Sequence, residues 1–305
     1  MSWLIVSLFA YFLFSIVSLT DKFLLAGPPK PKIYAFYAGT LGSLIILLIP
    51  FTGLFIPDAL TFFLCLLTGA IFVFSLLALY EGLEKYEASR VISAIGGLTP
   101  LFVFLLTFFI ARNKEPLPSA GIFAFVLLAS GSFLIARQDS EKTSKGGIII
   151  SALTAFLLAL YFFLAKYVYL ALPFWHGLIW IKIGSLFAAA SFLCSKEVRD
   201  ELFHKKHHKQ SFNKKTGALF IINQVFGASA AILQNWAIAL AGVAYVSIVV
   251  ALQGVQYIFI FIFAMLLSWK FPKILKEKNS KKIITQKIIA IILIAAGLAI
   301  LGLIS

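Results

Sequence analysis

The chain has 305 residues, of which 61% are hydrophobic and 12% charged, and its formal net charge is +14. Soluble domains carry about 25% charged residues, so this composition excludes an ordinary soluble protein and is typical of an integral membrane protein. The positive charge falls in short connections between apolar segments, without a basic soluble domain. We therefore expect the basic loops to contact anionic lipid headgroups, and we expect no nucleic-acid partner.

Ten apolar segments follow one another along the chain, each near the ~20 residues that a helix needs to cross a bilayer. Continuous apolar runs in lipid favour helices over barrel strands, because a helix satisfies its own backbone groups. The segments are residues 3–26, 33–50, 59–82, 89–111, 118–136, 147–170, 174–194, 216–240, 243–269 and 283–304. The first is too long for the apolar region of a signal peptide and is predicted as a retained span. The predicted fold class is all-α integral membrane, with ten transmembrane helices.

The second five segments repeat features of the first five. Residues 42–44 (Gly-Ser-Leu) match residues 184–186, and residues 129–131 (Ala-Ser-Gly) match residues 295–297 (Ala-Ala-Gly). A polar stretch at residues 138–147 divides the chain into repeats 1–137 and 147–305. Five helices is an odd number, so the second repeat must enter the membrane inverted relative to the first. Inverted repeats of this kind are typical of transporters, which bind their solute near midplane between the halves.

Charge in the connections predicts an orientation. The odd-numbered connections and their flanks carry 22 Lys and Arg residues, whereas the even-numbered ones carry only Arg112 and Lys114. Positive residues in short loops remain in the cytoplasm. The count therefore predicts a multi-pass protein of the cell membrane with both termini outside.

Residues 78–106, ALYEGLEKYEASRVISAIGGLTPLFVFLL, resemble the EamA-type members of the drug/metabolite transporter superfamily. The resemblance lies in a third helix ending Ala-Leu-Tyr, in Pro100 of the fourth helix, in Glu115 before the fifth helix and in Gly131 within it. It implies a ten-helix solute carrier and leaves the solute open. The second half departs from the pattern, with Gln256 in place of the proline and Lys281 in place of the glutamate. The family's termini are described as cytoplasmic, opposite to the charge count.

The ionisable residues limit the mechanism. None of the 12 acidic residues lies at the centre of an apolar segment, so we expect facilitated transport or exchange and not proton coupling through a buried carboxylate. Lys182 is the charge farthest from a segment end. It is predicted either to pair with an anionic group of the solute or to extend to the membrane interface.

Polar residues in three segments are candidates for substrate binding. Gln253, Gln256 and Tyr257 share one helix face near mid-span, where amides and a phenol can bind a polar solute. Thr99 lies on the corresponding fourth helix, and Asn223 and Gln224 lie in the eighth segment. The alternative role for all of them is hydrogen bonding between helices.

No catalytic residues, metal ligands or cofactor site are predicted, and the leading hypothesis is a carrier of a small-molecule solute. The competing hypotheses are a membrane transferase acting on lipid-linked substrates, a lipid-group flippase and an accessory subunit. The acidic residues Glu81, Glu84 and Glu87 are spaced as on an ordinary solvated helix end, which disfavours a transferase. The oligomeric state is left open.

Overall fold

The apolar runs of the sequence form helices throughout the computed structural model. It describes residues 2–24, 31–53, 55–86, 88–110, 118–136, 145–203, 214–270 and 281–304, and none of these forms a strand. Seven helices of this described part are long and apolar enough to cross a membrane, and two further apolar helices, Ala94–Ile110 and Ser119–Leu134, are shorter. The predicted all-α, multi-pass membrane class is confirmed at this level.

Thirteen α-helices and three short 3-10 helices (η) follow one another in the described residues. They are α1 (Ser2–Leu24), α2 (Pro31–Gly42), η1 (Ser43–Leu48), α3 (Ile49–Thr52), α4 (Ala59–Lys85), α5 (Ala88–Ile110), α6 (Ser119–Ala136), α7 (Lys145–Ala171), α8 (Phe174–Ser191), η2 (Phe192–Cys194), α9 (Lys196–Phe203), α10 (Lys214–Leu240), η3 (Val243–Tyr245), α11 (Val246–Ala251), α12 (Gln253–Lys270) and α13 (Lys281–Ile304).

Local chemistry explains where α4 begins and ends. Asp58 precedes its first residue and accepts hydrogen bonds from the backbone N–H groups of Leu60 and Thr61, both at 3.1 Å. Such N-caps satisfy donors that have no partner within the helix. Hydrogen bonds from Thr61, then from the neighbouring backbone, hold the pKa of Asp58 below its usual value. The helix therefore begins where the sequence predicts.

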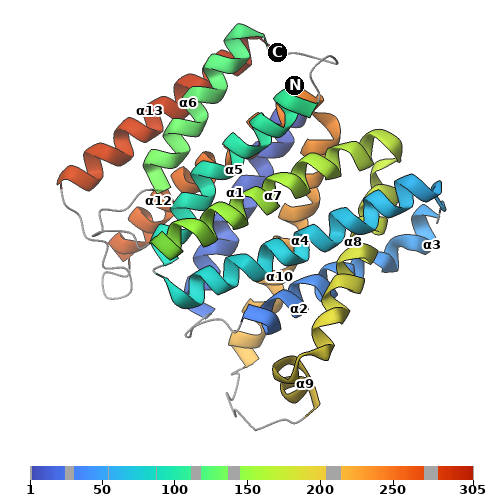
Figure 1. Cartoon of the computed structure of the whole chain (residues 1–305). Helices are drawn as coiled ribbons and strands as arrows, with labels where there is room; N and C mark the ends of the chain where they lie inside the picture. Colours follow the sequence, from blue (N-terminus) through green and yellow to red (C-terminus); the bar gives the residue numbers. More distant parts are fainter. Residues whose placement is uncertain are drawn as a thin grey trace.

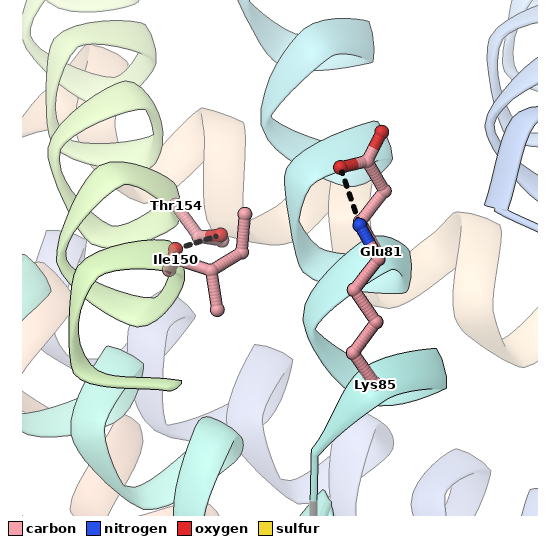
Figure 2. A network of polar contacts seen from close by, with 4 residues as sticks. All are labelled: Glu81, Lys85, Ile150 and Thr154. Atoms are coloured by element: carbon pink, nitrogen blue, oxygen red, sulfur yellow. Dashed lines mark hydrogen bonds and ion pairs between the residues drawn. The ribbon is translucent and has the colours of Figure 1, made fainter. Parts of the chain in front are cut away.

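The last turn of α4 carries an ion pair between Glu81 and Lys85, with 3.8 Å between the charged atoms. Figure 2 shows this pair on α4 near α7, where the Thr154 hydroxyl donates to the Ile150 carbonyl at 2.8 Å. The Glu81 and Lys85 side chains are 37% and 58% exposed. A carboxylate that is neutralised within its own exposed helix end is not arranged as an acid–base centre, as the sequence predicts for this acidic group.

Two of the predicted continuous spans are divided. Residues 33–50 form α2, then turn into η1 and α3, which ends at Gly53 with a φ of 74° that favours glycine. Residues 243–269 form η3, α11 and α12, and the single residue Leu252 separates α11 from α12. Leu252 has φ and ψ of −63° and −6°, and its N–H still donates to the Ile248 carbonyl at 2.9 Å, so the interruption is one tightened turn. By contrast, α5 runs through Pro100 without interruption. The interruption thus lies in the ninth span and not in the proline-containing fourth.

Five helix pairs dominate the packing: α1 with α10, α6 with α13, α4 with α7, α5 with α7 and α4 with α8. Helices α6 and α13 lie side by side at one edge of the molecule (Figure 1). A Cβ atom on Gly131 of α6 would lie 3.0 Å from the carbonyl oxygen of Ala290 on α13. Reciprocally, a Cβ atom on Gly297 of α13 would lie 3.1 Å from the carbonyl oxygen of Ala124 on α6. Small residues therefore allow the two backbones to approach closely.

Helix α4 crosses α8 at two further glycines. A Cβ atom on Gly69 would collide with the backbone of Ile181 and Ser185, and one on Gly184 would lie 2.6 Å from the backbone of Leu66. With α7 on its other side, α4 therefore lies deep in the helix bundle. The main apolar core includes residues of α1, α4, α7, α8, α10, α11 and α13.

Candidate functional site

Three buried polar side chains join α7 to α10, and we call them the Asn235 network. The Oδ1 atom of Asn235 accepts hydrogen bonds from the hydroxyl groups of Tyr161, at 3.0 Å, and Tyr169, at 2.8 Å. The Nδ2 atom of Asn235 donates to the Ala231 carbonyl at 2.9 Å. Asn235 is 3% exposed and Tyr161 2%. The network thus satisfies its polar groups inside the bundle, as buried groups require.

A second arrangement, the Tyr11 network, joins α1, α10 and α11. The Tyr11 hydroxyl donates to the Val249 carbonyl at 2.9 Å and accepts from the Gln234 amide at 3.2 Å. Gln234 and Asn235 are neighbours on α10, so this helix contacts Tyr11 of the N-terminal half and the tyrosines of α7 through adjacent side chains. The two networks meet at α10.

The interruption between α11 and α12 has side-chain partners from distant segments. Tyr11 donates to the carbonyl of Val249, and Ser132 of α6 donates to the carbonyl of Ala251 at 2.8 Å. Helix α12 then approaches α6 so closely that a Cβ atom on Gly254 would collide with the Ser132 hydroxyl. Irregular backbone at membrane depth is tolerated where surrounding protein supplies partners for the exposed carbonyls. The interruption is thus enclosed by α1 and α6.

The predicted polar face of the ninth span lies on the first turns of α12. The Gln256 amide donates to the Ser18 hydroxyl of α1 at 3.0 Å, and the Gln253 amide lies 3.4 Å from the Tyr257 hydroxyl. A Cβ atom on Gly96 of α5 would lie 2.9 Å from the same hydroxyl. All three predicted side chains are half-buried and hydrogen-bonded within the protein, between α1 and α5.

Lys182 extends from α8 toward α4 and α2. Its Nζ atom lies 4.4 Å from the centre of the Phe72 ring, and a Cβ atom on Gly42 would lie 3.6 Å from the same nitrogen. The Phe72 ring in turn packs 4.9 Å from the ring of Tyr161, a member of the Asn235 network. Lys182 therefore belongs to a contact chain that crosses from α8 through α4 to α7.

The remaining predicted site residues do not join this group. The Thr99 hydroxyl donates to the Ile95 carbonyl of its own helix at 2.7 Å. Asn223 is buried, whereas Gln224 is exposed on the outer face of the bundle. The structure thus brings together Lys182 with the Asn235 network, and the α12 glutamines with α1, and it leaves Thr99 and Gln224 apart from both.

Sequence reasoning missed the tyrosines. Tyr11, Tyr161 and Tyr169 are each at most 9% exposed. They connect the Asn235 network, the Tyr11 network and Lys182, which together we call the polar centre. None of the three was selected from the sequence. A signal was available, because a tyrosine inside an apolar segment needs a hydrogen-bond partner for its hydroxyl when buried.

In the described part of the chain, no group of three His, Cys, Asp or Glu residues is close enough to hold a metal ion. Cys65 is buried and Cys194 exposed, each as a free thiol. The polar centre consists of amides, phenols and one ammonium group. Such groups bind and orient a polar ligand, but they include neither an acid–base pair nor an activated nucleophile.

Comparison with known proteins supports the fold. No family model matches the chain, and no curated protein matches it. One solved structure, described only as a crystal structure of a protein, superposes with a TM-score of 0.70 at 16% sequence identity. The match covers 99% of this chain and 97% of that one. The chain is thus a helical membrane protein, and it shares its fold over nearly its whole length with a solved protein.

Proposed function

We propose that this protein is a solute carrier of the EamA type, with ten transmembrane helices in two inverted halves, that moves a small polar solute by alternating access. Its spans would be α1, α2 with η1 and α3, α4, α5, α6, α7, α8, α10, α11 with α12, and α13. The observation that carries the proposal is the set of polar side chains shared between residues 1–137 and 147–305 in the interior of the bundle. Polar groups at membrane depth are costly and commonly mark a substrate path.

The contact between α6 and α13 supports the inverted arrangement. Gly131 faces Ala290 and Ile294 of α13, and Gly297 faces Ala124 and Leu128 of α6. The same residue spacing recurs in both directions, as a pseudo-twofold axis between the two helices requires. The pair α1–α10 corresponds to the pair α7–α4 under the same operation. This reciprocity is stronger support than the short sequence matches, because it relates contacts and not only residue types.

The division of the ninth span supports a carrier over a purely structural membrane protein. In transporters, discontinuous helices expose backbone groups near midplane where a solute binds. Here the carbonyls of Val249 and Ala251 accept from Tyr11 and Ser132, and Gln256 contacts Ser18 immediately beyond. Helix α1 thus holds both sides of the interruption. A solute that competes for the amide of Gln256 would loosen α1 from α12, which links binding to movement.

The absence of a central carboxylate favours a solute gradient or exchange as the driving force. Among the described spans, acidic residues occur only in last turns, at Asp21 of α1 and at Glu81 and Glu84 of α4. A proton-coupled carrier needs a group that takes up and releases a proton within the path. Neither glutamate fits, since Glu81 pairs with Lys85 and Glu84 is exposed. The protein is therefore proposed as a uniporter or exchanger.

The test is uptake by the purified protein in liposomes, measured for a panel of neutral and charged metabolites. Replacement of Gln256 by Leu removes the amide that bonds Ser18 and should lower uptake at least about tenfold, the effect of ~1.4 kcal/mol. Ser130→Ala, on the exposed face of α6, is the control and should leave uptake unchanged. Equal uptake by Gln256→Leu and wild type would remove α12 from the path, and no uptake of any solute by folded protein would refute the proposed function.

A further inference from the structure

Lys166 and Lys182 both lie inside predicted spans, and they differ in their partners. Lys166 of α7 is 4% exposed and donates to the carbonyl of Ala239 at 2.9 Å, one residue before α10 ends. Carbonyls at a helix C-terminus carry partial negative charge and favour a cation. Lys166 thus has a structural role in closing α10.

Lys182 has no such partner. Among the described residues no ion pair involves it. Its Nζ atom lies 4.4 Å from the centre of the Phe72 ring and faces Gly42, which has no side chain. The residue follows the start of α8 by eight positions, or ~12 Å at 1.5 Å per residue. A ring face attracts an ammonium group, but it compensates only part of the loss of water. The site therefore holds positive charge without negative charge to balance it.

The direction of the side chain argues against simple extension to the interface. Gly42 belongs to α2 and Phe72 to α4, and both helices pack directly against α8. A lysine that escapes to the interface would run along its own helix toward headgroups. This one instead lies between helices, and it remains half-buried, so that part of the side chain is still accessible.

We propose that Lys182 binds the carboxylate or phosphate group of a small organic anion, and that this anion is the carried solute. The inference rests on the proposed function and names the class of its substrate. The anionic group takes the place of the Phe72 ring at Nζ, and the rest of the solute lies toward Tyr161, whose ring already packs against Phe72 at 4.9 Å. Gly42 leaves the space beside Nζ free of a side chain.

Binding is tested by thermal unfolding of the purified full-length protein in detergent with two matched pairs of probes. Benzoate is compared with benzamide, and glycerol 3-phosphate with glycerol, so that the second member of each pair lacks the anionic group. At least one anion should raise the unfolding temperature of wild type while its neutral partner does not. A shift with benzoate alone would identify a carboxylate site, and a shift with glycerol 3-phosphate alone would identify a phosphate site. No shift with either anion would overturn the inference.

Lys182→Met keeps the length of the side chain and removes its charge. The anion-induced shift should disappear, with affinity reduced about 30-fold or more, because one partner of a buried charge pair is lost. Lys182→Arg should retain binding, and Lys196→Met, on exposed α9, is the control that should behave as wild type. Without ligand, Lys182→Met should unfold at the same or a higher temperature than wild type, because an unbalanced charge has been removed. A lower unfolding temperature or failure to fold would identify a structural lysine and overturn the inference.

Transport separates this inference from the proposed function. Anion uptake into liposomes should be lost in Lys182→Met and kept in Lys196→Met. If only neutral solutes are transported, and equally by Lys182→Met, the anion site is refuted while the carrier stands. If folded wild type transports neither neutral nor anionic solutes, both proposals fail.

Discussion

Replacement of Asn235 by Leu tests whether the polar centre holds the helices together. The substitution keeps the branching at Cγ and the number of side-chain heavy atoms but leaves the hydroxyl groups of Tyr161 and Tyr169 without their acceptor. Interhelical hydrogen bonds in membranes contribute ~0.6 kcal/mol each on average, so the loss of two of them should lower the free energy of unfolding by at least ~1.2 kcal/mol. One fully orphaned buried hydroxyl costs up to ~3 kcal/mol. We therefore expect the free energy of unfolding to fall by ~1–3 kcal/mol.

The assay is reversible denaturation of the purified protein in mixed micelles. Gln224→Leu on the same helix is the control, since its side chain is exposed and its removal should change stability by less than ~0.5 kcal/mol. The triple variant Tyr161→Phe, Tyr169→Phe, Asn235→Leu removes the orphaned hydroxyls as well. It should be more stable than Asn235→Leu alone, because the penalty lies in the unpaired groups. An Asn235→Leu protein as stable as wild type, or a triple variant no more stable than the single one, would refute the reasoning.

Two further predictions concern α13 and α4. Gly131→Val should lower the free energy of unfolding by ~1–3 kcal/mol, because its side chain would overpack against Ala290 and Ile294 of α13. Gly302→Val is the control and should have no effect, because no atom lies within 4 Å of a Cβ atom placed there. Equal unfolding midpoints for the two variants would contradict the α6–α13 contact. Asp58→Ala should unfold at a lower temperature than wild type at neutral pH, because the ionised carboxylate caps α4. Since the pKa of Asp58 is lowered in the folded protein, its stabilisation is complete above the ordinary pKa and is lost as pH falls through the lowered value. A difference between Asp58→Ala and wild type that persists unchanged in strong acid would contradict this role.

The helices were predictable from the sequence because lipid imposes one solution on a long apolar run. The predicted span 59–82 corresponds to α4 (Ala59–Lys85), which begins at its Asp58 cap, and the predicted span 174–194 corresponds to α8 with η2 after Pro173. Hydropathy and local end signals suffice for such boundaries.

The interruption of the ninth span was not predictable in the same way. No proline marks Leu252, and the groups that stabilise the irregular turn come from elsewhere in the chain. Tyr11 donates to Val249 across 238 residues, and Ser132 donates to Ala251 across 119 residues. Propensity within a window carries no information on such tertiary partners.

The sequence gives the position of each candidate residue along its span, but it predicts only in part which of these residues face other helices. Gln256 and Lys182 do contact other helices inside the bundle, whereas Gln224 is exposed. Sequence position gives the depth of a residue in the membrane. Which face of a helix meets protein depends on its neighbours, and α10 carries polar residues on more than one face, so its pattern does not reveal that face. The roles of Gln253, Gln256, Tyr257, Thr99, Asn223, Gln224 and Lys182 in binding stay predictions.

The central claim, two inverted five-helix halves, is tested most directly by the sidedness of single cysteines in intact cells. With Cys65 and Cys194 replaced, cysteines at Ile56, Pro118, Lys145 and Lys196 would be labelled by an impermeant maleimide. The account predicts labelling from outside at Ile56 and Pro118, and none at Lys145 and Lys196. Two spans, α4 and α5, separate Ile56 from Pro118, and two, α7 and α8, separate Lys145 from Lys196, whereas α6 alone separates Pro118 from Lys145. Reversal at all four positions would correct only the orientation. Labelling of Pro118 and Lys145 from the same side would contradict the arrangement itself.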